Sequence, residues 1–451
     1  MRAREVILLA LLLAGGILFT QIYTGKLDVS WGFDEFPFWH LKEFEFEERE
    51  IISPPLPPEL ELLNAHGEVE IEGTDDEQIN IIFLKKFRRK NQEEAAAEAA
   101  GLRLFASKSE ERLKLSSNRD EVRKKNLKTC FKIQVPSSMK IKVENSYGLV
   151  MVQNVRDTEI SNPYGKTIVS DINGTLNLTN KYKNVEVTGV SSSCQIESHY
   201  SKVYLKDVAG ETNISHSYGT LNLENLSAGL TLQGRHSVVE GFKLTGPNQI
   251  ETTYKKIRLV EVGPTKLITH NSPVEIVQAE GEIFLENSYD RVSLKKIRGN
   301  LTVKGKYLRL SGADIRGDFL DISSSYREIE LSRFSGQTKI LLSHGDLILV
   351  PDSLTAPLEV NGDYVNISLT WPAGGRYPLE IHNKGGETNW LLKEKASFET
   401  LNNTTTLKAF SQEKTQPSIS ISTTYGTVTI REGDVPQRDT LSPEGNSLSL
   451  Y

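Results

Sequence analysis

The chain repeats itself about every 18 residues between Tyr147 and His344, and this period constrains the fold more than any other feature of the sequence. We call the residue that opens each repeat the corner. Apolar side chains follow most corners at positions three, five and eight, and another stands four residues before the next corner. Successive corners are 17, 18 or 19 residues apart, and they are Tyr147, Tyr164, Tyr182, Tyr200, Tyr218, His236, Tyr254, Asn271, Tyr289, Tyr307, Tyr326 and His344. Self-similarity of this length is typical of a solenoid in which each unit buries its apolar face on its neighbours.

Inside each repeat the apolar residues lie two apart, which indicates β-strands and not an amphipathic helix. A repeat of about 18 residues is also too short for a strand and a crossover helix, which together need roughly 30. The sequence therefore predicts an all-β fold, a single-stranded parallel β-helix with two or three short strands per coil. The chirality of parallel crossovers favours a right-handed helix. A strand spacing of about 4.8 Å gives the repeats a length of about 50–60 Å.

The chain divides into six segments of different composition. Two of them are expected to be caps, because both edges of an open β-rod need protection. The first two are a signal anchor or signal peptide at 1–25 and an acidic, aromatic, proline-rich linker at 26–58. The next two are an N-terminal β cap with a short helix at 59–140 and the repeats at 141–350. The last two are a C-terminal β region and cap at 351–431 and a polar tail at 432–451, which we expect to be disordered.

The first 25 residues predict targeting to a membrane. Arg2 and Arg4 precede an apolar stretch at residues 6–23. Positive charge before such a stretch predicts a cytoplasmic N-terminus, with the rest of the chain outside the cytoplasm. The stretch is long for a signal peptide and short for a full span of about 20 residues, and no clear cleavage site follows it. We favour a retained membrane anchor over a cleaved signal.

Composition narrows the function classes. The formal net charge is −6, and nothing in it favours nucleic acid as a partner. Two cysteines exclude a disulfide framework, and Cys194 occupies a position where other repeats have leucine or isoleucine. Basic runs at 85–90 and 119–132 are interpreted as solvated loops, with contact to anionic lipid or an envelope polymer as the alternative.

Two segments of the chain resemble a known family. They are Leu60–Gly73, and Ile133–Pro136 followed by Ile141–Gly148. They resemble the bacterial "putative adhesin" β-helix family, a domain of unknown function, over about residues 59–431. The resemblance implies a β-helix that is exported or membrane-tethered and associated with the cell envelope, without established catalytic residues. The tyrosine corners are more regular here than that family leads us to expect.

The tyrosine corners form the candidate binding site. One tyrosine per coil predicts a column of rings, either an exposed ladder for a sugar or polymer chain or, as we favour, a structural stack. The tyrosines concerned are Tyr147, Tyr164, Tyr182, Tyr200, Tyr218, Tyr254, Tyr289, Tyr307 and Tyr326.

Metal and catalytic patterns are weak in this sequence. His199 and His216 lie on adjacent coils, but no carboxylate or thiolate stands at a convincing ligand spacing. No carboxylate cluster recurs on neighbouring coils as a glycan-cleaving β-helix would need, and the common nucleophile, phosphate-loop and zinc motifs are missing. We therefore expect no cofactor, no metal and no catalytic residues.

These observations predict a non-enzymatic, membrane-anchored extracytoplasmic β-helix, adhesin-like or a scaffold and interaction module of the envelope. Its expected partners are the membrane and either an envelope polysaccharide or another envelope protein. The alternatives are a polysaccharide-active lyase or hydrolase with the same fold, and an envelope-stress sensing domain.

Overall fold

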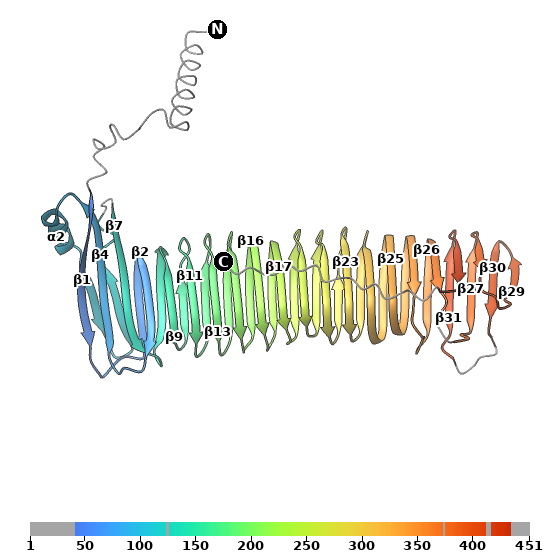
Figure 1. The fold of residues 1–451 in the computed structure, drawn as a ribbon, viewed down its shortest axis with the longest axis horizontal. Coiled ribbons are helices and arrows are strands. Elements are labelled where there is room, and N and C mark those ends of the chain that lie inside the picture. The colour runs from blue at the N-terminus through green and yellow to red at the C-terminus, as the bar shows by residue number, and fades with distance from the viewer. Residues whose placement is uncertain (1–40, 123–125, 373–374, 412–415, 434–451) are drawn as a thin grey trace, which may run out of the picture.

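The computed structural model describes residues 41–122, 126–372, 375–411 and 416–433. In this part of the chain the strands stack side by side into one long rod, with helix α2 (Gln92–Ala100) at one end (Figure 1). The protein is a parallel β-solenoid of about 13 turns with roughly 18 residues per coil, which confirms the fold predicted from the repeat. The handedness stays a prediction.

Each regular coil contributes one strand to each of two sheets. The first sheet contains β9 (Val150–Val155), β11 (Thr167–Ile172), β13 (Val185–Val190), β15 (Lys202–Val208), β19 (Ile257–Val262), β21 (Val274–Glu280) and β23 (Arg291–Arg298). The second contains β8 (Lys140–Tyr147), β10 (Thr158–Ser161), β12 (Leu176–Asn180), β14 (Cys194–His199), β18 (Asn248–Thr253), β20 (Thr265–His270), β22 (Ile283–Glu286) and β24 (Leu301–Lys306). Longer strands continue round the corners and serve both sheets, namely β16 (Thr212–Leu226), β17 (Leu230–Leu244), β25 (Arg309–Val350) and β26 (Leu358–Thr370).

The parallel register places equivalent residues of successive coils on top of one another. Val187 pairs with Leu205, and Leu205 pairs with Leu223 in the next coil. All three are buried, so they form one aliphatic column inside the rod, as the sequence predicts. Burial of each such side chain stabilises the folded state by about 1.5–3 kcal/mol, and every added coil adds the same contribution.

A left-handed residue seven positions after the corner explains why the inward-facing apolar residues stand at positions three, five and eight. Simple alternation would place position seven inside the rod and position eight outside. In Asp171, Asp207 and Asn225 the φ angle is +55°, +56° and +57°, and the ladder register skips this position. The kink resets the alternation, so position eight (Ile172 and Val208 in these coils) points inward again.

Glycine ten residues after the corner permits a tight turn where coils approach closely. A Cβ built on Gly299 would lie 2.1 Å from the carbonyl oxygen of Gly281, and one on Gly317 would lie 2.2 Å from that of Gly299. The φ angles of Gly281 and Gly299 are +109° and +149°. Glycine is therefore favoured here for a steric reason and for a conformational one.

At the N-terminal end the first coil of the chain is not the outermost coil. Strand β2 lies between β6 and β8, and β3 lies between β7 and β9. Antiparallel strands and helix α2 complete this cap. Its elements are β1 (Lys42–Ile52), β2 (Glu59–His66), β3 (Glu68–Thr74), β4 (Ile79–Arg89), α2, β5 (Leu104–Lys108), β6 (Arg112–Ser117) and β7 (Leu127–Pro136).

Two features of this cap differ from the sequence-based expectations. Residues 42–52 fall within the range assigned to the linker, yet they form β1, which pairs with β4. The prediction that the basic run at 85–90 is a solvated loop is wrong, because its residues lie on β4 and on its end. They pair with acidic residues of β1 and α2: Lys85 with Glu48 at 2.7 Å, Lys86 with Glu45 at 2.8 Å, Arg88 with Glu43 at 3.1 Å and Arg89 with Glu98 at 2.5 Å.

The C-terminal end repeats the same exchange of order. Strand β31 lies between β26 and β27, and β32 lies between β26 and β28. The last coil in sequence is thus covered by an earlier segment of the chain. The elements of this cap are β27 (Leu379–Lys384), β28 (Thr388–Trp390), β29 (Ser397–Leu401), β30 (Thr404–Ala409), β31 (Ile419–Thr424) and β32 (Val428–Arg431).

The short helix predicted within the N-terminal cap is confirmed as α2. Asn91 caps its N-terminus by accepting a hydrogen bond from the backbone N–H of Glu94. Among the described residues, no helix is long and apolar enough to cross a membrane. The predicted anchor at residues 1–25 and the tail at 434–451 lie outside the described residues.

Candidate functional site: an aromatic ladder

The corner residues bring their side chains into one stack of rings along the rod, which we call the aromatic ladder. Neighbouring ring centroids are 4.7–5.9 Å apart, and their planes are inclined by 6–20°. Asn271 interrupts the stack. The first part contains His66, Tyr147, Tyr164, Tyr182, Tyr200, Tyr218, His236 and Tyr254. The second contains Tyr289, Tyr307, Tyr326, His344, Tyr364 and Tyr425.

All nine tyrosines of the predicted ladder lie in this stack, although their role in binding stays a prediction. Sequence reasoning missed Tyr364 as a rung. The signal was present, because Ile367 and Leu369 follow it at positions three and five. His66 and Tyr425 carry the corner pattern too, but only the exchanged order of the end coils brings them onto the stack.

The ladder presents ring edges and hydroxyl groups to solvent, since its faces cover one another. The tyrosine side chains of the ladder are 38–58% exposed. No ladder hydroxyl makes a hydrogen bond to another residue in the described part of the chain. The outer surface is therefore a row of unpartnered phenol groups repeating with the coil spacing of about 4.8 Å.

Most ladder tyrosines occupy a backbone conformation that tyrosine rarely adopts. From Tyr200 to Tyr425 the ladder residues have φ between +50° and +71°. A left-handed residue costs roughly 1–2 kcal/mol, and asparagine tolerates it better than most. Stacking offsets this with about 0.5–1.5 kcal/mol per pair. Asn271, with φ of +53°, shows that a corner forms without a ring.

A column of buried polar side chains lies beneath the ladder, two residues before most corners. Hydrogen bonds to backbone carbonyl oxygens near the corners are donated by Asn145, Asn162, Asn180, Asn287, Asn383 and His216. Asn180, for example, donates to Asn162 O at 2.7 Å and to Gly165 O at 2.8 Å. The column comprises Asn64, Asn145, Asn162, Asn180, Ser198, His216, Thr252, Thr269, Asn287, Ser324, Asn383 and Thr423. Membership of this column accounts for the buried position of His216.

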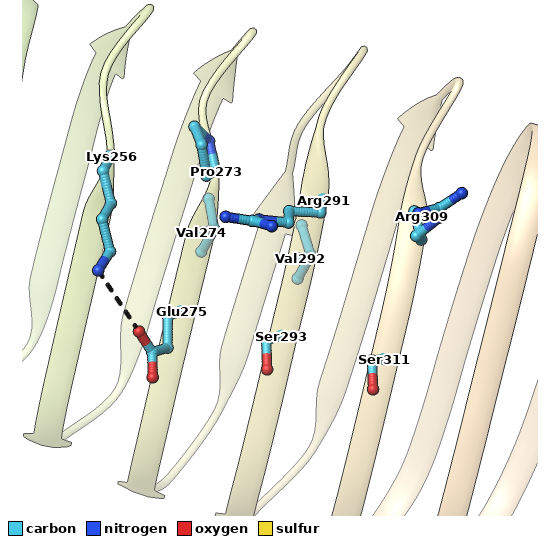
Figure 2. Close-up of a pocket in the computed structure, with 9 residues that line it drawn as sticks. All are labelled: Lys256, Pro273, Val274, Glu275, Arg291, Val292, Ser293, Arg309 and Ser311. Carbon is cyan, nitrogen blue, oxygen red and sulfur yellow. Dashed lines mark ion pairs between the residues drawn. The ribbon is translucent and has the colours of Figure 1, made fainter.

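A groove of about 330 Å³ lies beside the interruption of the ladder (Figure 2). It crosses four coils just past their corners, and we call it the basic groove. Its lining is Lys256, Pro273, Val274, Glu275, Arg291, Val292, Ser293, Arg309 and Ser311. A second hollow of about 180 Å³ adjoins it through Arg291 and Arg309 and reaches the rings of Tyr289 and Tyr307.

The histidines of adjacent coils are engaged by hydroxyl and carbonyl groups. His199 Nδ1 lies 2.6 Å from Ser217 Oγ. His216 Nδ1 lies 2.7 Å from Ser237 Oγ, and its Nε2–H donates to Ser201 O at 3.1 Å. Burial lowers the pKa of His216, so the neutral ring is favoured. The hydrogen bonds of these two histidines link neighbouring coils.

One cluster in the described chain combines three residues of metal-ligating type, Glu68, Glu70 and Cys130. Lys132 Nζ forms an ion pair with the Glu70 carboxylate at 3.2 Å. Burial raises the pKa of the Cys130 thiol to about 12, so the ligating thiolate is strongly disfavoured. Chemically, the cluster is a buried thiol beside an ion pair.

Carboxyl groups on the rod surface are tuned toward ionisation. The backbone N–H of Thr175 lowers the pKa of Asp157, Arg298 lowers that of Asp314, and Lys408 lowers that of Glu380.

Comparisons with known proteins add little to this description. No family model matches the chain, and no curated protein matches it. A solved structure from Clostridium sporogenes, named a "putative cell adhesion protein", aligns with 86% of this chain and 100% of its own length. The identity is 10% and the TM-score is 0.20, so the likeness carries no information about function.

Proposed function

We propose that this protein is a non-enzymatic, membrane-anchored extracytoplasmic rod that works as an adhesin-like or scaffold and interaction module, with the aromatic ladder as its contact surface. The observation that carries the proposal is the row of half-exposed, unpartnered phenols along the rod. Their stacking merely offsets the backbone energy of a left-handed tyrosine, so stability alone gives little reason for a ring at every corner.

A surface that repeats with every coil is suited to an extended partner. A polymer chain lying along the ladder would meet a hydroxyl group and a ring edge about every 4.8 Å. Many weak contacts of this kind act together, because each one raises the effective concentration for the next. An envelope polysaccharide fits this requirement, and an extended segment of another envelope protein is the alternative partner.

The location outside the cytoplasm rests on the sequence of residues 1–25, with Arg2 and Arg4 before the apolar stretch at 6–23. We expect the protein to sediment with membranes and to enter the soluble fraction only when detergent is added. Release by salt or alkali alone would contradict the retained anchor.

Substitution within the ladder tests its role. The changes Tyr200→Asn, Tyr218→Asn and Tyr326→Asn together remove three rungs, and each places asparagine at a left-handed corner like that of Asn271. We expect the variant to fold and to lose most of its binding to isolated cell-wall and envelope fractions. Tyr204→Asn is the matched control, since Tyr204 lies off the ladder and bonds Glu224.

Equal binding by the triple variant and the wild type would refute the ladder as the contact surface. Release of new sugar ends from a bound polysaccharide would favour the enzymatic alternative, provided that one carboxylate substitution abolished it. Binding studies with intact rods and soluble wall fragments distinguish these outcomes in one experiment.

A further inference from the structure

The ladder lacks one ring, and this interruption has a defined shape. Ile257 of β19 pairs with Val274 of β21, which in turn pairs with Val292 of β23. The corners Tyr254, Asn271 and Tyr289 therefore lie on successive coils. Two coil spacings, about 9.6 Å, separate the two tyrosines. Because stacked rings elsewhere in the ladder lie 4.7–5.9 Å apart, this space, the ladder gap, is one ring thick.

The rings of Tyr254 and Tyr289 form the two walls of the ladder gap. Tyr254 stacks on His236 with one face only, and Tyr289 stacks on Tyr307 with one face only. Both side chains are more than half exposed, at 54% and 58%. Between them stands the exposed amide of Asn271, which offers two N–H donors and one acceptor.

The basic groove beside the gap holds a guanidinium without an acidic partner. Arg291 forms no ion pair with any residue in the described ranges, and it lies across the groove near Pro273 (Figure 2). The carboxylate of Glu275 is engaged by Arg258 at 3.3 Å and by Lys256 at 3.8 Å.

The charge around Arg291 favours an anion. Arg309 contacts Glu328 only at 3.7 Å, and Arg327 lines the neighbouring hollow. Asp290 is the one other acid at this place, and its Oδ1 accepts the backbone N–H of Arg291 at 2.7 Å. A guanidinium prefers a planar carboxylate, which it can bind through two parallel hydrogen bonds.

We propose that the ladder gap and the basic groove together bind one acidic sugar unit, a hexuronate within a glycan chain. Its ring enters between Tyr254 and Tyr289, and its carboxylate binds Arg291. The hydroxyl groups of the sugar meet Asn271 and Ser293. This site rests on the proposed function and deepens it, since it fixes the register of an acidic polymer along the ladder.

A sugar ring suits this site better than an aromatic side chain of a protein partner. Both have apolar faces that stack on a phenol ring. The sugar also brings hydroxyl groups for the amide and serine that line the site and a carboxylate for the guanidinium. An aromatic side chain would leave these polar groups without partners, which is unfavourable once water is excluded.

The experiment measures binding of hexagalacturonate to the detergent-solubilised full chain by calorimetry, with an uncharged hexasaccharide of glucose as the matched ligand. We expect the acidic ligand to bind at about 1 mM or below and at least tenfold more tightly than the neutral one. Asn271→Tyr fills the gap with the missing rung and should abolish this binding while leaving the melting temperature unchanged or higher. Arg291→Gln should weaken it at least tenfold.

Two variants serve as controls. Tyr204→Asn changes a tyrosine that lies off the ladder and outside the basic groove, so its affinity should equal that of the wild type. Tyr218→Asn opens a gap at which the position equivalent to Arg291 is the uncharged Val238, and this gap should not bind the acidic ligand.

Unchanged binding in Asn271→Tyr or Arg291→Gln would overturn the site, as would equal affinity for both ligands. An acidic peptide containing tyrosine that binds wild type but not Asn271→Tyr, where hexagalacturonate does not bind, would overturn the glycan assignment. If no hexasaccharide binds but envelope fractions still bind through the ladder, this inference fails while the proposed function stands.

Discussion

Replacing Asn180 with alanine should destabilise the middle of the rod more than any change on its surface. The side chain is fully buried in the polar column. Its amide donates to the carbonyl oxygens of Asn162 at 2.7 Å and Gly165 at 2.8 Å, and its oxygen accepts the backbone N–H of Lys183 at 3.3 Å. Alanine has no polar atoms, so it removes all three hydrogen bonds.

The magnitude follows from the groups left behind. Each buried carbonyl without a donor costs about 1–3 kcal/mol, so the two carbonyls together predict a loss of roughly 2–6 kcal/mol in the free energy of unfolding. Asn177→Ala is the matched control, because Asn177 lies on the same strand and points to solvent. We expect its effect to stay within about 0.5 kcal/mol.

Urea unfolding measures the overall effect, and native-state hydrogen exchange locates it. The amides of β11, β12 and β13 should exchange faster in Asn180→Ala, and those near the two caps should change little, because a coil contacts only its neighbours. If both alanine variants unfold at the same urea concentration, the buried hydrogen bonds do not stabilise the corner and the reasoning is refuted.

Three further predictions concern buried groups. Val203→Asp places a charge in the aliphatic column and should unfold the neighbouring coils, whereas Lys202→Asp on the surface should not; thermal melting separates the two. Burial lowers the folded-state pKa of His216, so the unfolded chain binds more protons below about pH 6.5 and stability falls as the pH decreases. His216→Asn, the side chain found in other coils, should flatten this pH dependence in urea titrations between about pH 7 and 5. Burial raises the pKa of Cys130 and Cys194 to about 12, so neither thiol should react with iodoacetamide at neutral pH until the rod unfolds, as mass spectrometry would show.

The regular part of the fold could be predicted because one physical rule governs every coil. Apolar side chains at fixed distances from the corner must face inward, and a period of 18 residues leaves room only for stacked strands. The same rule identifies Val187, Leu205 and Leu223 as core residues before any coordinates are known. It also brings the tyrosine corners onto one line.

The caps and the polar column could not be predicted from the same rule. Local patterns predict β-strands in both caps, but they do not show that Glu59–His66 and Ile419–Thr424 each lie between two other coils. Pairing order depends on contacts between segments far apart in sequence. A buried asparagine also looks like a turn residue in sequence, because its hydrogen bonds go to carbonyl groups of neighbouring corners.

The ladder gap could be predicted only in part. Asn271 is visible in sequence as a corner without a ring, but a missing ring alone suggests only a tolerated substitution. The position of Arg291 beside the gap, without an acidic partner among the described residues, depends on the register of β21 and β23. Asn271 therefore becomes part of a candidate site only when the strand register, which places Arg291 beside it, is known.

The exchanged order of the end coils has a mechanical consequence for a tethered rod. Strand β2 is held on one side by β6 and on the other by β8, and β31 is held in the same way by β26 and β27. To fray from the C-terminal side, or from the N-terminal side once β1 has left β4, the chain must break two rows of backbone hydrogen bonds at once, whereas an ordinary terminal strand breaks one. A pull on the N-terminal end, once it has detached β1, must therefore separate β2 from two neighbouring strands together and cannot remove a single-paired terminal strand first.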